Sequence, residues 1–225
     1  MLGDEQFVDR LSSARGRSAD LAARQLVAFR KGTPGVLGEV GLAALQTWQT
    51  LSETQGRGRG DVDVAVLFTD LVGFSSWALE AGDEPAIELL LALSDAIEPP
   101  MIEQRGEIVK RLGDGLMAVF WDASSAAQAA FAACERASAI EVHGYVPRLR
   151  TGIHLGRPRK IGGDYFGVDV NIAARLAEAA EPGEILVSGR TLKSLDGAAV
   201  TSTKRRFAAE GAPPDLTAHA VRQPA

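Results

Sequence analysis

Residues 67–75 read LFTDLVGFS, and residues 109–118 read VKRLGDGLMA. The first stretch ends a run from about residue 62 that is apolar on both faces, which is typical of a central strand covered on both sides. The second lies in two short strand-like runs, 108–112 and 116–120. Gly113-Asp114-Gly115 joins these runs and is typical of a tight hairpin turn. The two stretches therefore predict a central strand and a hairpin in one sheet.

The segments around these stretches predict the remaining elements of the fold. A helix is indicated from Asp83-Glu84-Pro85 to about residue 101, and an alanine-rich helix over 124–139. A strand over 147–154 completes a β-α-β-β-α-β order, which indicates an α+β, ferredoxin-like core with an antiparallel sheet. A helix over 168–180 and strands over 184–188 and 216–221 are expected to follow. The first helix is expected to bury a stripe formed by Ile87, Leu90, Leu91, Ser94, Ile97 and Met101.

The first quarter of the chain has a different pattern. Residues 1–55 show loosely helical apolar spacing and are interpreted as a helical N-terminal segment, regulatory or dimerising. Residues 56–60, GRGRG, read as a flexible linker to a main domain over 61–225. A phosphate-binding loop is the alternative for this linker. It is disfavoured because the glycines precede a strand and no Gly-Lys-Ser/Thr follows.

Composition excludes several classes of protein. With 225 residues of which 46% are hydrophobic, the chain can bury a sizeable core. A net charge of −5 disfavours nucleic acid as the main partner. The single cysteine, Cys134, allows no internal disulfide and fits a reducing compartment. Because no apolar run approaches about 20 residues and no signal-peptide core is present, we expect a cytoplasmic chain without a transmembrane segment.

Two aspartates occupy positions from which they could hold a metal ion. Asp70 ends the central strand and Asp114 lies at the tip of the hairpin. Because the strand lies beside the hairpin in a ferredoxin-like sheet, the two carboxylates are expected to converge and to suit Mg²⁺ or Mn²⁺. Each aspartate taken singly also fits a turn former or a helix cap. The backbone amides at Gly73 and Phe74, which lead toward a helix, could cradle phosphate oxygens.

Four stretches together resemble one known family. Residues 67–75, 109–118, 150–156 (RTGIHLG) and 164–176 (DYFGVDVNIAARL) are similar, in this order, to the motifs of class III nucleotidyl cyclases, most of all to bacterial short-armed members. The resemblance covers about residues 61–222. It implies a homodimeric adenylate cyclase that converts ATP to cyclic AMP and pyrophosphate with two Mg²⁺ or Mn²⁺ ions per active site.

The resemblance also implies a role for individual residues near the phosphates. Asp70 and Asp114 would bind both metal ions, with the carbonyl of Leu71 as an additional ligand. Arg150 would meet the terminal phosphates. Family members often carry a further lysine that contacts pyrophosphate near the positions of Glu210 and Gly211, and this chain lacks it. A solvated basic run is the favoured interpretation of residues 204–206, Lys-Arg-Arg, although one of them could substitute for that lysine.

A second set of residues is implied to handle the nucleoside. Lys110 and Asp164 would read the base, Asn171 would orient the ribose, and Arg175 would stabilise the transition state. Asn171 and Arg175 are four residues apart and therefore share one helical face. Lysine only donates and carboxylate only accepts, so this pair complements the adjacent acceptor and donor of adenine. Guanine presents the inverted pattern, which favours ATP as substrate.

Alternatives remain open at this point. Residues 162–166, GGDYF, resemble the signature of diguanylate cyclases. In that family the signature occupies the hairpin turn, which here is residues 112–115, so the similarity is interpreted as a decoy. A guanylate cyclase, or a catalytically weak domain that binds nucleotide for regulation, are the further alternatives. His154 could be a general base, but its place inside the strand motif favours a structural, hydrogen-bonded histidine.

Overall fold

The computed structural model describes residues 60, 62–197, 200–207 and 216–224. The predicted N-terminal helical segment (1–55) and residues 56–59 of the predicted linker lie outside the described residues. Gly60, at the end of that linker, is described, and its amide donates a hydrogen bond of 2.8 Å to the carbonyl of Arg157. The division of the chain into a segment, a linker and a main domain therefore stays a prediction.

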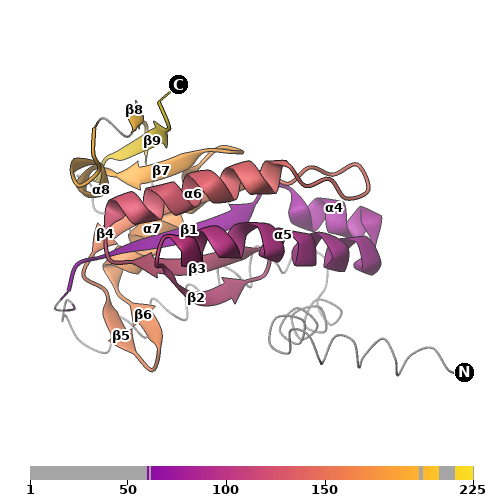
Figure 1. Cartoon of the computed structure of the whole chain (residues 1–225), viewed down its shortest axis with the longest axis horizontal. Coiled ribbons are helices and arrows are strands. Elements are labelled where there is room, and N and C mark those ends of the chain that lie inside the picture. The colour runs from indigo at the N-terminus through magenta and orange to yellow at the C-terminus, as the bar shows by residue number, and fades with distance from the viewer. Residues whose placement is uncertain (1–59, 61, 198–199, 208–215, 225) are drawn as a thin grey trace, which may run out of the picture.

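A seven-stranded sheet forms the centre of the molecule, in the order β2-β3-β1-β4-β7-β9-β8 (Figure 1). The strands are β1 (Val64–Leu71), β2 (Glu107–Leu112), β3 (Gly115–Phe120), β4 (Leu149–Gly156), β7 (Ile185–Ser188), β8 (Thr201–Arg205) and β9 (Ala218–Arg222). The first four strands pair antiparallel, and β4 pairs parallel with β7. The predicted ferredoxin-like α+β core is confirmed, and the C-terminal strands extend it.

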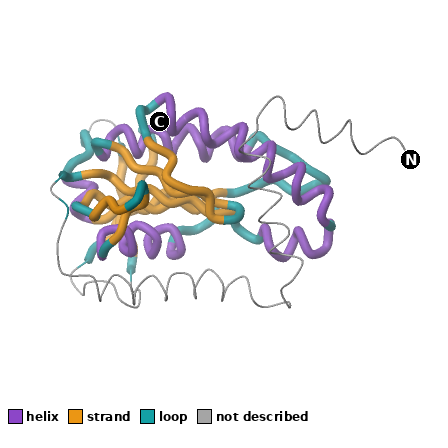
Figure 2. Tube along the Cα trace, turned by 90° about the horizontal axis from the view of Figure 1, so that it is seen from below, coloured by secondary structure: helices purple, strands orange, loops and turns teal. Residues whose placement is uncertain are grey.

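Helices cover both faces of the sheet (Figures 1 and 2). Helices α5 (Asp83–Glu103) and α6 (Ala123–Ser138) lie on one face, and α7 (Val168–Ala179) lies on the other. Leu67 of β1 packs into the core on the first face, whereas Val66 and Phe68 pack into the core under α7. This alternation confirms the prediction of a central strand that is apolar on both sides, because successive side chains of a strand point to opposite faces.

The buried stripe of α5 agrees with the prediction at Ile97 and Met101 and differs from it in the first half of the helix. The helix buries Ala86, Leu89, Leu93, Ile97, Pro100 and Met101. Ile87 and Leu91, which were expected in the stripe, are 36% and 37% exposed. Three consecutive leucines, 89–91, leave the phase of an amphipathic helix ambiguous in the sequence. Packing against α6 and the sheet selects the stripe through Leu89 and Leu93 instead.

Several short elements have no counterpart in the sequence prediction. Helix α4 (Phe74–Ala81) precedes α5, and helix α8 (Gly189–Lys193) follows β7. Strands β5 (Arg159–Ile161) and β6 (Asp164–Phe166) form a separate two-stranded sheet, and β8 lies at the edge of the main sheet. Such elements of three to eight residues are too short to show a periodicity. Within the described residues, no helix is both long and apolar enough to cross a bilayer.

Helix α7 approaches β4 at a glycine. A Cβ atom on Gly152 would lie 2.2 Å from the amide nitrogen of Ala177 and 2.3 Å from the carbonyl oxygen of Ala173. Both neighbours are backbone atoms of the helix and cannot rotate away. The absence of a side chain at Gly152 therefore sets the distance between α7 and the sheet.

We predict that Gly152→Ala lowers the free energy of unfolding by at least about 2 kcal/mol, because overpacking against backbone forces the helix away from the strand. Urea denaturation followed by circular dichroism measures this change. Gly197→Ala is the matched control, because no atom of the described residues, its chain neighbours apart, lies within 4 Å of the added methyl group. An unchanged unfolding midpoint for Gly152→Ala would contradict the close approach.

Candidate active site

The end of β1 brings Asp70 between two neighbouring strands. On one side, the register pairs Asp70 with Arg150 of β4, and the Arg150 guanidinium forms an ion pair with the Asp70 carboxylate. On the other side, Gly115 begins β3, and a Cβ atom on it would lie 2.0 Å from the carbonyl oxygen of Thr69. Only glycine fits at that distance. The hairpin turn that carries Asp114 is thereby brought against the end of β1, as the sequence predicts.

Asp114 and Asp70 share one electrostatic environment. The pKa of Asp114 is raised to about 7, first by burial and then by the negative charge of Asp70. Hydrogen bonds from the backbone amides of Asp114 and Leu71, and the positive charge of Arg150, act in the opposite direction. The sequence prediction that the two carboxylates meet is therefore supported by their mutual repulsion.

The donor atoms at this site suit a divalent cation. Two carboxylates that repel each other gain stability when a hard cation binds between them, and oxygen donors are the ligands that Mg²⁺ and Mn²⁺ prefer. Within residues 60, 62–197, 200–207 and 216–224, no group of three or more His, Cys, Asp or Glu side chains could hold a metal ion. Leu71, the proposed carbonyl ligand, follows Asp70 as the last residue of β1.

The segment after Asp70 turns into a helix with open amides. Gly73 is the N-cap of α4, with a left-handed φ of 74°, and Phe74 is the first helical residue with a buried ring. No side chain from the described part of the chain caps this N-terminus. Uncapped amides at a helix N-terminus are suited to bind phosphate oxygens.

Sequence reasoning missed Tyr145, which holds this segment in place. Its hydroxyl donates a hydrogen bond of 2.7 Å to the carbonyl of Val72, and its ring stacks on Trp77 with 4.7 Å between centroids. Burial, followed by the negative charges of Asp114 and Asp70, raises the pKa of the phenol. No signal in the sequence connects residue 145 with residue 72, because the contact exists only in the folded chain.

The predicted base-reading pair is brought together. Lys110 Nζ lies 2.6 Å from Asp164 Oδ2, and the two side chains are 28% and 30% exposed. Asp164 also accepts a hydrogen bond of 2.8 Å from the amide of Tyr165. The β5–β6 hairpin places Asp164 beside β2, and it turns at Gly162 and Gly163, which both have positive φ. The GGDYF stretch thus forms a turn of its own, separate from the β2–β3 hairpin that carries Asp114.

Asn171 and Arg175 lie half-buried on α7. Nη1 of Arg175 pairs with Glu178 at 2.7 Å, and Arg150 donates a long hydrogen bond of 3.5 Å to the Glu178 carbonyl. Among the described residues, the Nε atoms of both arginines are buried without a hydrogen-bond partner. An unsatisfied buried donor costs about 1–3 kcal/mol, so an anionic ligand that reached these atoms would be favoured.

His154 and Arg205, also considered in the sequence, both have polar partners. His154 is buried, and both of its ring nitrogens have partners, which confirms the structural interpretation. Arg205 pairs with Glu181 and Glu184. Its charge is therefore already engaged, and Lys204 is exposed on β8. Glu210 and Gly211, where the pyrophosphate lysine was expected, lie outside the described residues.

The family model "Adenylate and Guanylate cyclase catalytic domain" matches residues 59–212. An adenylate cyclase of Streptomyces coelicolor is 35% identical over 127 residues, which are 56% of this chain and 32% of that protein. A pH-sensitive adenylate cyclase of Mycobacterium tuberculosis is 30% identical over 143 residues, which are 62% of this chain and 34% of that protein. The matches thus span about a third of the length of these relatives.

Solved structures share the fold. The adenylyl cyclase CyaB from P. aeruginosa superposes with a TM-score of 0.61 at 23% identity, covering 72% of this chain and 95% of the other. The guanylate cyclase domain of RhGC from Catenaria anguillulae, crystallised with GTP, has a TM-score of 0.66 at 18% identity and covers 72% of this chain and 97% of the other. At these identities the likeness concerns the fold.

We predict that Asp114→Asn stabilises the metal-free protein above about pH 7 and not below about pH 4. Burial and the charge of Asp70 hold the folded pKa of Asp114, at about 7, above the ordinary value of an aspartate. The folded state therefore binds more protons than the unfolded state in this window, and the free energy of unfolding falls as pH rises through it. Asparagine has no charge to repel, so the variant should gain about 1–3 kcal/mol at about pH 8.

Urea denaturation in the presence of a chelator, at about pH 4 and about pH 8, measures this difference. Asp83→Asn, an exposed position at the start of α5, is the control and should show no comparable gain at high pH. Equal stability of wild type and Asp114→Asn at about pH 8 would mean that burial and the charge of Asp70 do not raise the pKa of Asp114.

Proposed function

Because the family model matches residues 59–212, this chain belongs to the family of adenylate and guanylate cyclase catalytic domains, and we propose that it converts ATP to 3′,5′-cyclic AMP and pyrophosphate. The observation that carries the choice of ATP is the contact of Lys110 with Asp164 at 2.6 Å. The similarity to bacterial adenylate cyclases supports the same choice.

The Lys110–Asp164 pair presents a donor next to an acceptor. Adenine offers the complementary order on one edge, because ring N1 accepts and the exocyclic amine donates. Guanine offers the opposite order, with O6 accepting and N1 donating. A guanine in this place would leave polar groups unpaired, at a cost of about 1–3 kcal/mol each. Both side chains are partly exposed, so a base can replace the contact that they make with each other.

Asp70 and Asp114 would hold the metal ions in this proposal. Two divalent cations would supply a lowered pKa of the ribose 3′-hydroxyl and neutralise charge on the triphosphate. Asp114 must give up its proton for this role, and Arg150 must leave its ion pair with Asp70. Arg150 is then free to meet the terminal phosphates, and the open amides at Gly73 and Phe74 face the same part of the substrate.

Asn171 and Arg175 would act on the ribose and on the reacting phosphate. The proposed reaction is in-line attack of the 3′-hydroxyl on the α-phosphorus, with pyrophosphate as leaving group. Charge on the phosphoryl oxygens grows in the transition state, and a guanidinium placed there stabilises it. The buried, unpartnered Nε of Arg175 supports this role, since among the described residues it is a donor without an acceptor.

The two sets of residues suggest a shared site in a homodimer. The metal set (Asp70 and Asp114) and the nucleoside set (Lys110, Asp164, Asn171 and Arg175) are all present in one chain. A two-fold dimer that combines the metal set of one copy with the nucleoside set of the other would have two equivalent sites. We propose this arrangement for the present chain, with two Mg²⁺ or Mn²⁺ ions in each site.

The purified protein is expected to form cyclic AMP from ATP in the presence of Mn²⁺, and to use GTP at least about tenfold less efficiently because of the mismatch at Lys110 and Asp164. Chromatography that separates cyclic AMP, cyclic GMP and cyclic di-GMP measures the products. A chelator should abolish turnover. Cyclic di-GMP formed from GTP would overturn the assignment, and tight ATP binding without any cyclic product would instead support a regulatory nucleotide-binding domain.

Mixing two inactive variants tests the shared site. Asp70→Ala and Arg175→Ala chains should each be inactive alone. A mixture in equal amounts should recover about one quarter of the wild-type activity, because half of the dimers are mixed and each of these has one intact site. Mixed dimers are verified by differently tagged chains. Absence of recovery although mixed dimers form would exclude sharing between Asp70 and Arg175.

A further inference from the structure

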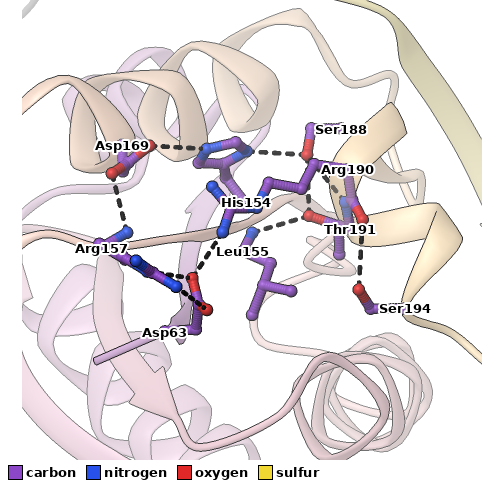
Figure 3. A network of polar contacts seen from close by, with 9 residues as sticks. All are labelled: Asp63, His154, Leu155, Arg157, Asp169, Ser188, Arg190, Thr191 and Ser194. Carbon is purple, nitrogen blue, oxygen red and sulfur yellow. Dashed lines mark hydrogen bonds and ion pairs between the residues drawn. The ribbon is translucent and has the colours of Figure 1, made fainter. Parts of the chain in front are cut away.

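His154 lies at the centre of a buried polar cluster that the proposed chemistry does not use (Figure 3). Its Nε2 atom is 3.1 Å from Asp169 Oδ1 on α7, and its Nδ1 atom is 2.7 Å from Ser188 Oγ at the end of β7. The residues concerned are nearly inaccessible, with exposures of 4% for His154, 7% for Asp169 and 0% for Ser188. One side chain of β4 thus connects α7 with the C-terminal part of the sheet.

Two hydroxyls continue the cluster from His154 toward α8. Thr191 Oγ1 accepts from the amide of Leu155 and lies 3.3 Å from the carbonyl of Ile153. The hydroxyls of Thr191 and Ser188 are 2.8 Å apart. Ser188 therefore contacts both His154 and Thr191.

Asp169 is on the other side of the ring. A carboxylate only accepts, so Nε2 of His154 donates to Asp169 Oδ1. The ring is thus hydrogen-bonded on both sides, and one of these bonds joins it to the Asp169 carboxylate in the interior of the protein.

The Asp169 carboxylate packs closely against the end of β4. Its second oxygen, Oδ2, accepts a hydrogen bond of 2.8 Å from the amide of Arg157. A Cβ atom on Gly156 would lie 2.3 Å from Asp169 Cγ, so only glycine leaves room for this carboxylate. The Asp169 side chain of α7 is therefore held at three points near the end of β4: the His154 ring, the space beside Gly156 and the Arg157 amide.

Charged groups at the surface surround this cluster. The Arg157 guanidinium pairs with Asp63 at 3.1 Å, and Arg190 pairs with the same carboxylate at 2.5 Å. Asp63 lies just before β1, and its pKa is lowered first by its hydrogen bond with Arg157. Figure 3 shows these ion pairs beside the buried cluster. From the elements packed against His154, the facing polar groups are Asp169 of α7, Ser188 of β7 and Thr191 of α8, with Arg157, Asp63 and Arg190 beyond them.

Asp169 is the second residue of α7, two positions before Asn171 and six before Arg175. The N-cap of this helix, Gly167, has no side-chain capping bond within the described chain. The side chain of Asp169 thus fixes the first turn of α7 to β4. A small rotation of the helix about its axis would move Asn171 and Arg175 together.

We infer that the buried His154–Asp169 pair is a positioning element that sets the orientation of α7, and with it the side chains of Asn171 and Arg175, for the cyclase reaction. The inference rests on the proposed function. Neither residue of the pair touches the substrate in this account. Displacement of reacting groups by about 1 Å is sufficient to lower turnover about 100-fold, so the effect on catalysis should exceed the effect on binding.

Kinetics of three variants test the inference. Asp169→Asn and His154→Gln each alter one partner of the pair, and Gly156→Ala leaves both partners but obstructs the space that the Asp169 carboxylate occupies. Each should lower kcat for ATP by about 10- to 100-fold and change KM by less than about 3-fold, because the base is held by Lys110 and Asp164, outside α7.

Thr191→Val is the matched control. It removes a buried hydroxyl whose hydrogen bonds, among the described residues, go to β4 and β7 and not to α7, so it should lower the melting temperature while kcat stays within about twofold of wild type. A variant of the pair that melts like Thr191→Val and keeps the wild-type kcat would overturn the positioning role. A parallel loss of kcat in Thr191→Val would also overturn it, because general destabilisation would then explain all the losses.

Nitrogen-15 NMR of the wild-type imidazole rings gives a readout that is independent of activity and of any variant's folding. The chain has three histidines, and the spectrum of His154→Gln, or selective protection from exchange, assigns the buried ring. A protonated Nε2 is expected because it faces the Asp169 carboxylate, and an unprotonated Nε2 would overturn the contact on which the positioning role rests. A wild-type protein that forms no cyclic nucleotide would refute the proposed function, whereas an active wild type with unaffected Asp169→Asn would refute only the positioning role.

Discussion

The constraint on which the candidate active site depends is a buried carboxylate, Asp114, placed next to a second carboxylate, Asp70. Strand pairing places Asp70 at the end of β1, and the bare backbone of Gly115 lets the hairpin bring Asp114 against it. Burial first, and then the negative charge of Asp70, raises the pKa of Asp114 to about 7. Arg150 compensates part of this charge in the ligand-free chain. A site that is unfavourable without cations is suited to recruit them, since hard divalent ions favour such oxygen donors.

Two glycines of β4 have an equivalent role for helix α7. Gly152 lets the helix backbone approach the sheet, and Gly156 receives the carboxylate of Asp169. Between them, His154 reaches the same carboxylate from the strand. Buried polar groups of this kind are costly unless fully paired, so they specify one arrangement of helix and strand rather than adding much stability. The helix that carries Asn171 and Arg175 is therefore oriented by polar contacts as well as by apolar packing.

Much of the fold could be predicted because its signals are local. Alternation of apolar residues indicated β1, Gly113-Asp114-Gly115 indicated the hairpin, and the order of the elements indicated the ferredoxin-like core. The short elements α4, β5, β6, α8 and β8 were missed because three to eight residues hold no readable period. In the first half of α5 the sequence prediction named the wrong buried residues. Consecutive leucines fit more than one helical phase, and only packing selects Leu89 and Leu93.

The sequence by itself determined the chemistry that is available: two acidic residues beside strand ends, a lysine and an aspartate of complementary hydrogen-bonding character, and an asparagine and arginine on one helical face. Residue type and spacing carry that information because they depend on covalent structure and helix geometry alone. Only the tertiary structure decided the electrostatic state of these groups. Contacts between residues far apart in the chain raise the pKa of Asp114, connect Tyr145 with the carbonyl of Val72 and pair His154 with Asp169. No local sequence pattern records such contacts.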